Sequence, residues 1–378
     1  MDRRTFILGG LAAMGALIGG GTLFVNTPQF GHVPTGERLR RMMKSPHYID
    51  GKFQNLVPVE VMTDSGENRI VATWKFLFGD KSVLSPKQPM LSSKTDIKSL
   101  PRGEDVAVWM GHSSFFLRLD GWSILIDPVF SPYASPVFFI NKAFAGSNVY
   151  TAADMPDIDV LAITHDHWDH LDYPTVTALK SKIKHVVCPL GVGEYFEQWG
   201  FAPSIIHEDD WDTEISLHAD GKKPDLSVHI LPSQHFSGRF LTQNPTLWCG
   251  FAFVTPKRKV YTSGDGGYGA HFKKIGEEFG GFDLAIMENG QYNMAWHQIH
   301  MLPDETAQAA DDIGAKHVIP SHSGKFALAR HPWQEPYESL AAASKGKSYR
   351  LLTPRIGECV PLGRLDSEHF TRWWEMMS

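Results

Sequence analysis

The sequence predicts an α/β fold in which histidine or aspartate side chains stand directly after several strands. Apolar and β-branched segments of strand length alternate with helix-like segments through residues 105–378. Four of the strands lead into polar positions, namely the run His165–His170 and the single residues His235, Asp265 and His322. Because α/β folds place ligands beyond the carboxyl ends of their strands, we expect these side chains to meet at one edge of the fold.

The first strands of this region form a predicted hairpin. Val106–Trp109 precedes two further apolar segments, Phe115–Leu119 and Ser123–Ile126, and the Asp120-Gly121 pair between these two is a frequent hairpin turn. Asp127 follows the third segment and precedes a proline. Its carboxylate is suited either to orienting a ligand histidine or to capping the end of its own strand.

The segment 164–172 reads THDHWDHLD and offers five good metal ligands in six positions. It follows the apolar strand Asp159–Thr164 and precedes a helix predicted from Tyr173 to Leu179, with proline near its first turn. Three imidazoles interleaved with carboxylates suit Zn²⁺ or iron. A solvated polar loop is one alternative, and a structural zinc site is another, although such sites usually include cysteine. The pattern therefore favours a metal site after this strand.

Later segments continue the alternation of strands and helices. Helices are predicted over Gly193–Trp199 and Asp304–Ile313. The later strands are Lys184–Pro189, Asp225–Pro232, Leu247–Thr255, Lys259–Gly267 with Asp265 after its β-rich part, Asp283–Glu288 and His317–His322. A single histidine such as His235 or His322 is more often a surface or core residue than a ligand. Recurrence of such residues at the same structural position favours ligand roles here.

The segment from Val129 to Tyr150 is an unusually apolar loop. It contains Phe130, Tyr133, Val137, Phe138, Phe139, Ile140 and Phe144. Exposed, these side chains would suit a lipid or another apolar substrate. We expect most of the loop to be buried as ordinary core.

Composition excludes some classes of protein. The chain has 378 residues, which is enough for a substantial core, and a formal net charge of -6, which does not favour a nucleic-acid partner. The three cysteines, Cys188, Cys249 and Cys359, form no Cys-x-x-Cys pair. We therefore expect no disulfide scaffold and interpret all three as small core residues.

The N-terminal part divides into two regions. Residues 1–25 contain the pair Arg3-Arg4 before an uncharged Gly/Ala/Leu run, the pattern of a twin-arginine export signal or an uncleaved membrane anchor, which predicts a location in the bacterial cell envelope, in the periplasm or at the inner membrane. Residues 26–104 are expected to be an extension that wraps the core. Their basic stretch Arg38–Lys44 could face anionic lipid or simply be a solvated face.

The residues His165–His170 match the H-x-H-x-D-H loop of the metallo-β-lactamase superfamily position by position. Within it, the chain most resembles the branch of N-acylphosphatidylethanolamine-hydrolysing phospholipase D and the ascorbate-6-phosphate lactonases. The supporting segments are 109–113 (WMGHS), 126–128 (IDP), 171–173 (LDY), 234–236 (QHF), 264–268 (GDGGY) and 321–322 (SH). Together they span roughly residues 105–330.

This resemblance implies a four-layer αββα sandwich over residues 105–378 with two zinc ions at one edge. It assigns His165, His167 and His235 to one ion and Asp169, His170 and His322 to the other. Asp265 would bridge the two ions. None of these positions is cysteine, in contrast to many antibiotic-hydrolysing members.

The resemblance also implies a function, a zinc-dependent phosphodiesterase acting on a phospholipid-like or other small substrate through a metal-bridging hydroxide. Asp169 and Asp265 would hold the remaining proton of the hydroxide. His300 aligns with a histidine near the reacting group, where it would stabilise the oxyanion or protonate the leaving group; a polar residue at a helix start is the alternative. A lactonase or other carboxylic-ester hydrolase and a metal-holding sensor remain open, whereas the charge and the export signal oppose a nuclease. Membrane contact through the N-terminus and the apolar loop is a further expectation.

Overall fold

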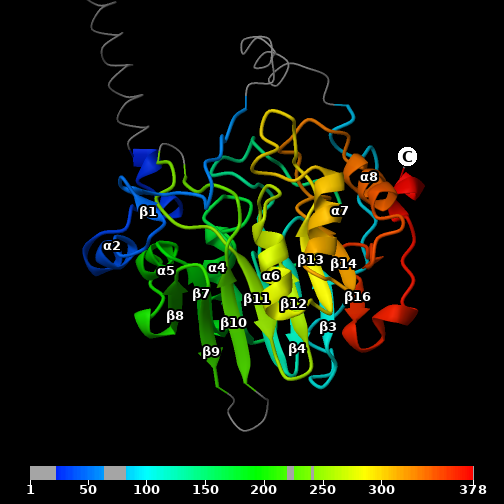
Figure 1. Cartoon of the computed structure of the whole chain (residues 1–378), viewed down its shortest axis with the longest axis horizontal. Coiled ribbons are helices and arrows are strands. Elements are labelled where there is room, and N and C mark those ends of the chain that lie inside the picture. The colour runs from blue at the N-terminus through cyan, green and yellow to red at the C-terminus, as the bar shows by residue number, and fades with distance from the viewer. Residues whose placement is uncertain (1–22, 64–81, 219–224, 240–241, 378) are drawn as a thin grey trace, which may run out of the picture.

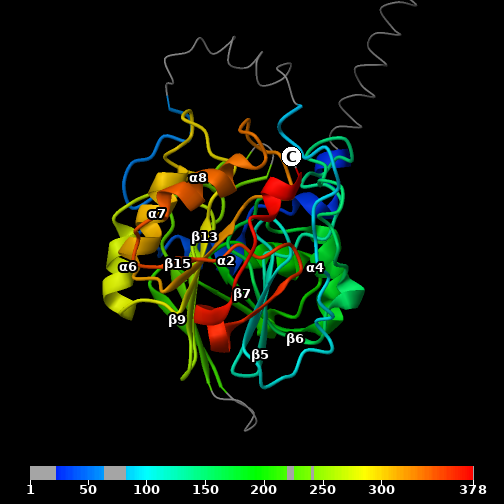
Figure 2. The same cartoon turned by 90° about the vertical axis from the view of Figure 1, so that its right-hand side faces the viewer.

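Two β-sheets pack face to face with helices on both outer sides (Figures 1 and 2). The computed structural model describes residues 23–63, 82–218, 225–239 and 242–377. Nearly all of the expected export signal at residues 1–25 lies outside these described residues. The layers seen edge-on in Figure 2 confirm the predicted αββα sandwich.

The first sheet has seven strands in the order β16-β3-β4-β5-β6-β7-β8. Pairing is antiparallel from β16 to β5 and parallel from β5 to β8. The strands are β3 (Val106–Trp109), β4 (Phe115–Leu119), β5 (Trp122–Ile126), β6 (Ile158–Ala162), β7 (Ile183–Pro189), β8 (Ile206–Asp209) and β16 (Cys359–Pro361).

The second sheet also has seven strands, in the order β15-β14-β13-β12-β11-β10-β9. Its β12 to β15 are parallel, and β9 to β12 are antiparallel. The strands are β9 (Thr213–Leu217), β10 (Leu226–Leu231), β11 (Gly250–Val254), β12 (Lys259–Thr262), β13 (Leu284–Glu288), β14 (His317–Ser321) and β15 (Arg350–Leu351). A separate hairpin pairs β1 (Tyr48–Ile49) with β2 (Lys52–Phe53).

Helices cover the outer faces of both sheets (Figure 2). Apolar residues of α4 (Tyr173–Leu179) and α5 (Gly193–Gln198) pack on the first sheet, and those of α6 (His271–Phe279) and α7 (Pro303–Asp312) pack on the second. The other helices are α2 (Gly36–Met42) and α8 (Glu335–Ala343). Short 3₁₀ turns are η1 (Pro28–Phe30), η2 (Ala152–Asp154), η3 (Lys180–Lys182), η4 (Pro203–Ile205), η5 (Leu362–Ser367) and η6 (Trp373–Met377).

The largest hydrophobic cluster lies between the two sheets. Ile124 and Val160 of the first sheet share it with Val228, Phe251 and Ile286 of the second, and all five are essentially inaccessible. Burial of this apolar area supplies the main driving force for folding. It fixes the sheets against each other, so the loops at their common edge start from rigid strands.

The predicted strands formed with one notable difference in their bounds. β11 begins at Gly250 instead of Leu247. The amides of Leu247 and Cys249 donate to the carbonyls of Leu190 and Thr164 in the first sheet's loops, and are therefore not available to the β10–β11 ladder. The sequence analysis did not predict β8, β9, α6 or α8, although α6 is capped by the left-handed Gly280 and α8 has Pro336 in its first turn.

The apolar loop from Val129 to Tyr150 corrects our expectation of burial. Its ends are buried, but Phe138, Phe139 and Ile140 at its tip are 75%, 70% and 45% exposed. The loop turns back on itself through a Tyr133–Lys142 bridge, so its tip projects beyond the surface on which the ends pack.

Residues before the first sheet also contribute to the core. Met42, Phe53, Met90 and Ile97 are buried in its hydrophobic clusters. The basic stretch is solvated at Arg40 and Arg41, whose side chains are 66% and 43% exposed, as one alternative expected. Arg38 departs from it, because its side chain is only 10% exposed and pairs with glutamates of α5 and β8. Within the part of the chain that the structure describes, no helix combines the length and apolar character needed to cross a bilayer. The three cysteines are free, as predicted, but only Cys188 and Cys249 are buried core residues, and Cys359 is partly exposed.

Candidate metal centre

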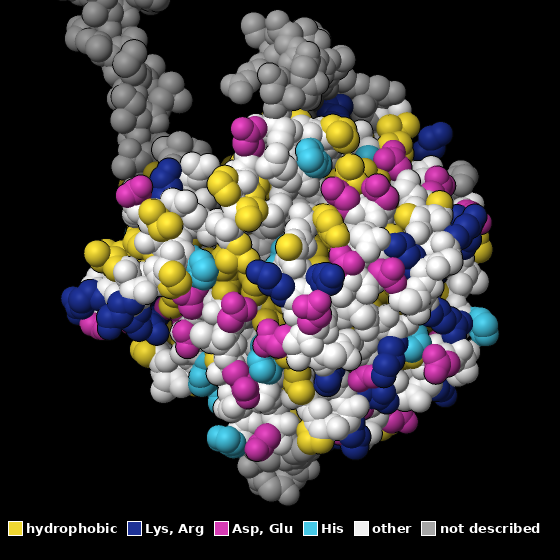
Figure 3. All heavy atoms as spheres, viewed as in Figure 1, with side chains coloured by type: hydrophobic (Ala, Val, Ile, Leu, Met, Phe, Trp, Pro, Cys, Tyr) yellow, Lys and Arg dark blue, Asp and Glu magenta, His cyan; other side chains and the backbone are white. Residues whose placement is uncertain are grey.

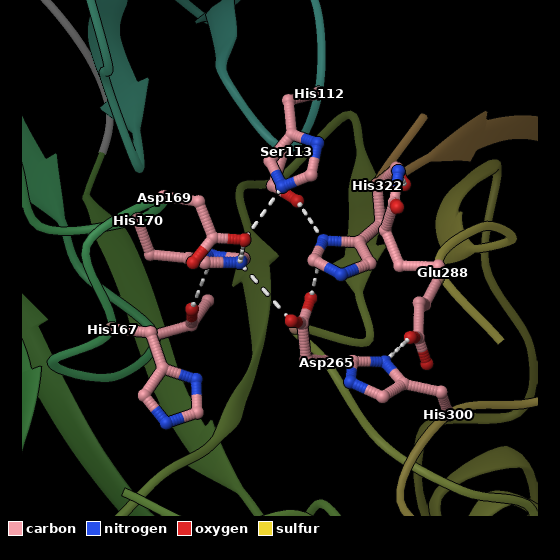
Figure 4. Close-up of polar contacts among 12 residues, drawn as sticks. His112, Ser113, His167, Asp169, His170, Asp265, Glu288, His300 and His322 are labelled. Carbon is pink, nitrogen blue, oxygen red and sulfur yellow. Dashed lines mark hydrogen bonds and ion pairs between the residues drawn. The ribbon is translucent and has the colours of Figure 1, made fainter. Parts of the chain in front are cut away.

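The candidate ligands converge at one edge of the sandwich (Figure 4). Each follows a strand that is held in the core: the histidine-rich loop follows β6, and the single residues follow β10, β12 and β14. Their side chains form groups in which ligand atoms lie within 4.8 Å of one another. The structure thus brings together all seven predicted positions: His165, His167, Asp169, His170, His235, Asp265 and His322.

One group consists of three imidazoles. His165 Nε2 lies 2.9 Å from His167 Nδ1, and His235 Nε2 lies 3.3 Å from that same nitrogen. His235 is oriented from behind, because its Nδ1 lies 3.0 Å from the carbonyl oxygen of Ile299. That contact requires the proton on Nδ1 and leaves Nε2 as a free acceptor towards the other two rings.

A second group contains Asp169, His170 and His322, joined by His112. Asp265 lies between the two groups. Its Oδ2 is 3.1 Å from His170 Nε2 and 3.9 Å from the Nε2 atoms of His165 and His235, and its Oδ1 is 3.1 Å from His322 Nδ1 (Figure 4).

The donor set fits divalent metal ions. Among the described residues, His170 Nε2 and Asp265 Oδ1 are buried and form no hydrogen bond, although each has an ion-pair contact at 3.1 Å. Burying such atoms is costly unless a ligand completes them. Imidazole nitrogens with carboxylate oxygens are ligands that zinc and related metals prefer. The cluster is therefore able to hold metal.

Burial sets the charge state of most imidazoles in the cluster. It lowers the pKa of four of them below the usual range, to about 4 in the case of His167, and the set is His165, His167, His235 and His322. These rings are neutral near pH 7 and present lone pairs rather than protons, which is the form that binds metal.

The pKa of His170 is raised, in contrast to the lowered pKa of the four other imidazoles. Burial opposes protonation of this ring, but Asp265 and Asp169 raise its pKa well above the usual range. Burial also raises the pKa of Asp265 to about 7, although His170 opposes the shift. These two shifts meet at the point where the two groups of ligands adjoin, because His170 Nε2 lies 3.1 Å from Asp265 Oδ2.

Asp127 orients both the histidine-rich loop and one of its rings. Its Oδ2 lies 2.7 Å from His170 Nδ1 and accepts a 2.6 Å bond from Thr164 Oγ1, and its Oδ1 accepts the Thr164 amide at 2.8 Å. The contacts match the histidine-orienting alternative drawn from the sequence; the carboxylate does not cap its own strand β5 but bonds to Thr164, which follows β6. Hydrogen bonds of this kind fix the tautomer of a ligand histidine.

Three residues around the site adopt left-handed backbone conformations that side chains disfavour. They are His112 (φ 54°), Asp127 (φ 40°) and His322 (φ 60°). Each such residue costs on the order of 1–3 kcal/mol, and such strain concentrates at functional sites. The surrounding structure must therefore stabilise the backbone at these positions.

Two residues of the cluster were not recognised as candidates from the sequence. His112 is buried, and its Nε2 lies 2.7 Å from Asp169 Oδ2. Glu288 is the last residue of β13, and its carboxylate contacts His300 Nδ1. The position of Glu288 after an apolar strand was the available signal, because it matches the position of the other candidates.

A cavity of about 210 Å³ opens onto the cluster. Its floor includes Asp169, Asp265, His300 and His322. His167 and Gln291 add two further polar groups, and apolar side chains form the other half of the lining: Val61, Met62, Phe236, Trp296, Ile299 and Leu328. A substrate with an apolar portion next to a polar reacting group fits such a lining.

Arg239 fastens the histidine-rich loop from outside. The fully buried guanidinium donates to the carbonyl oxygens of Asp166 and Gln29, at 2.6 and 2.5 Å, and to that of Leu171. It also stacks 4.2 Å from the ring centroid of Trp168. One cation therefore ties the loop to the segment that precedes α2.

Comparison with known proteins agrees with this geometry. The family profile described as "Beta-lactamase superfamily domain" matches residues 123–323, which is more than half of the chain and includes all seven predicted ligands. With the αββα sandwich and its buried His/Asp cluster, this match defines a metal-dependent hydrolase.

Relatives place the chain within that class. It is 36% identical over 338 residues to an uncharacterized protein of Mycobacterium tuberculosis, covering 88% of each chain. It is 32% identical over 277 residues to N-acyl-phosphatidylethanolamine-hydrolyzing phospholipase D 1 of Caenorhabditis elegans, covering 69% of this chain and 75% of that protein. The chain belongs to the metallo-β-lactamase superfamily, in the branch of these phospholipases, as the sequence motifs predicted.

A solved structure shows the same fold. CmlA, a diiron beta-hydroxylase from Streptomyces venezuelae, is similar with a TM-score of 0.52 at 19% identity, covering 68% of this chain and 54% of that chain. At this level of identity the likeness concerns the fold alone.

Proposed function

We propose that the protein is a zinc-dependent phosphodiesterase that hydrolyses a phospholipid-like substrate. The observation that carries the proposal is the cavity, in which two groups of metal ligands share Asp265 next to a half-apolar lining. One zinc ion would be held by His165, His167 and His235, the other by Asp169, His170 and His322, and Asp265 would serve both.

The side chains around the cavity have distinct parts in the proposed reaction. When bound, the metal ions would lower the pKa of water and polarise the phosphoryl group. Asp265 lies between the two groups and would hold the remaining proton of the attacking hydroxide together with Asp169. Asp169 is itself held in place by His112. His300 lines the cavity and donates to the leaving oxygen.

The choice of a phospholipid-like substrate rests on the apolar lining and on the C. elegans relative, whose name states that substrate class. Exposed apolar side chains occur beside the cavity as well. Leu56, Val57, Met62 and Met294 are each at least half exposed, and the amide of Thr63 donates to the carbonyl of Ala295. Figure 3 shows hydrophobic side chains gathered over the upper half of one face. Contact of this region with a bilayer would bring the cavity to a lipid substrate.

The proposed cell-envelope location rests on the twin arginines at Arg3 and Arg4. Replacing both with lysine should leave the protein in the cytoplasm when cells are fractionated. Unchanged recovery in the envelope fraction would contradict export by this route.

An activity panel tests the function. Purified protein loaded with zinc is expected to hydrolyse N-acylphosphatidylethanolamine and bis(p-nitrophenyl) phosphate, to lose both activities with a chelator and to regain them with zinc. Turnover of lactones or carboxylic esters, with both phosphodiesters ignored, would replace the proposal with an ester-hydrolase assignment. Full phosphodiesterase activity after complete removal of metal would contradict the metal requirement.

A further inference from the structure

His300 is held between the metal ligands and a buried carboxylate. Its ring stacks on that of His322, with centroids 5.2 Å apart and planes 10° from parallel, and meets the ring of His235 edge-on at 4.9 Å. On its other side, His300 Nδ1 contacts Glu288 Oε1. Figure 4 shows the Glu288 carboxylate beside one nitrogen of His300, with the ring extending from there towards Asp265.

Glu288 itself has no access to the cavity. Its side chain is completely buried, and it is absent from the residues that line the cavity, whereas His300 is among them. Both carboxylate oxygens are used, because Oε2 accepts the Gly266 amide at 2.9 Å while Oε1 contacts His300. The backbone of Glu288 is fixed as well, since Thr306 Oγ1 donates to its carbonyl at 2.9 Å.

This arrangement determines which nitrogen of His300 carries out chemistry. Burial raises the pKa of Glu288 well above the usual range, and hydrogen bonds from the backbone amides of Gly266 and Met301 oppose that shift. In its ionised form the carboxylate can only accept, so the contact then places a proton on Nδ1 and leaves the Nε2 lone pair directed at the cavity. A buried carboxylate beside an imidazole also stabilises the imidazolium form through a charge-assisted bond. A ring that is stacked on one side and bonded on the other loses little orientation during the reaction.

We propose that Glu288 is a positioning residue, which fixes the tautomer and the orientation of His300 so that Nε2 protonates the leaving oxygen of the substrate. The inference rests on the proposed function. In the reaction, water forms a new bond to phosphorus, and the bond from phosphorus to the leaving alcohol oxygen breaks. The bonding pair stays on that oxygen. His300 Nε2, which is unprotonated in the resting tautomer, first takes up by way of solvent the proton that the attacking water releases and then passes it to that oxygen.

The test compares leaving groups. p-Nitrophenolate leaves without a proton, whereas the alkoxide of a phospholipid needs one. Glu288→Gln should lower kcat on an alkyl phosphodiester by about 10²-fold, with KM little changed, and lower kcat on bis(p-nitrophenyl) phosphate by under about threefold. His300→Gln should show the same pattern, and the double variant should be little worse than either single one.

A spectroscopic measurement tests the positioning without turnover. In the zinc-loaded protein, ¹⁵N NMR of the histidine signal that His300→Gln removes should show the proton on Nδ1. Glu288→Gln presents an amide group that can donate to Nδ1, so the proton should move to Nε2 in a fraction of the molecules. Glu288→Asp, which keeps the charge, should restore part of the alkyl-substrate activity.

Glu208→Gln is the matched control. Glu208 is also a buried carboxylate, but it pairs with Arg38 and Arg41 and does not line the cavity. This variant should alter stability and leave the dependence on leaving group as in the wild type.

Three results would overturn the inference. Equal losses on aryl and alkyl substrates in Glu288→Gln would show a general structural effect, and an unchanged His300 tautomer would show that Glu288 does not set it. Loss of one metal ion per chain in Glu288→Gln would make Glu288 a metal ligand, in the group that it forms with Asp265, His300 and His322. Failure of the proposed function is distinguishable, because the wild type would then hydrolyse neither phosphodiester while the NMR result still held.

Discussion

Asp127→Asn is predicted to weaken metal binding without touching a ligand position. In the wild type, Oδ2 faces two donors, His170 Nδ1 at 2.7 Å and Thr164 Oγ1 at 2.6 Å. An asparagine that keeps its oxygen on the Thr164 amide turns an NH₂ group towards both. The hydroxyl can rotate to accept, but the ring can avoid the clash only by moving its proton to Nε2, the nitrogen that faces Asp265.

Loss of such an orienting partner lowers metal affinity by about 10–100-fold. This range corresponds to about 1.4–2.7 kcal/mol of binding free energy. Zinc titration in competition with a chromophoric chelator measures it, with calorimetric unfolding of the same samples as a check on folding. Because one of the two proposed sites contains His170, only one of two zinc affinities should fall.

Asp172→Asn supplies the control. Asp172 is a buried carboxylate in the same loop, but it accepts from Ser131 and Thr175 and contacts none of the candidate ligands. It should reduce thermal stability and keep both zinc affinities. Wild-type affinity in Asp127→Asn, or an equal loss in Asp172→Asn, would refute the orienting role of Asp127.

Two further changes test the scaffold. Arg239→Lys keeps the charge but can replace few of the three bonds to carbonyl oxygens, so urea unfolding should show a loss of about 2–4 kcal/mol in the free energy of unfolding. The exposed Arg364→Lys should lose under about 0.5 kcal/mol, and equal losses in the two variants would contradict the role of Arg239. Burial lowers the pKa of Lys325 to about 7. The unfolded chain therefore binds more protons between pH 7 and 10.5, and wild-type stability should rise relative to Lys325→Met by about 2 kcal/mol from pH 7 to pH 9. If the difference in unfolding free energy between the wild type and Lys325→Met stayed constant with pH, as expected for the exposed Lys52→Met, Lys325 would not have a lowered pKa in the folded protein.

The sequence predicted most of the sheets and the meeting point of the candidate ligands. Strands such as β6 and β13 are mostly apolar because both faces are buried, and that pattern can be read without a structure. Positions directly after such strands must lie at a common edge in parallel parts of a sheet. For this reason His235, Asp265 and His322 could be placed near the loop at 165–170.

Residues that act through others were harder to predict. Glu288 matters only because His300, in the segment after β13, contacts it. His112 matters only because it contacts Asp169, in the segment after β6. Neither contact has a local signature in the sequence. The apolar tip at Phe138 and Phe139 was misassigned to the core because composition reports hydrophobicity but not whether a partner surface lies opposite. Arg38 was misassigned for the same reason, since its glutamate partners are distant in sequence.

Anomalous diffraction at the zinc absorption edge, from crystals of the zinc-loaded protein, tests the central claim most directly. The account predicts two peaks about 3.5–4 Å apart on either side of Asp265. One peak should lie among His165, His167 and His235, and the other among Asp169, His170 and His322. An absence of peaks in this cluster, or peaks only at surface histidines, would contradict it.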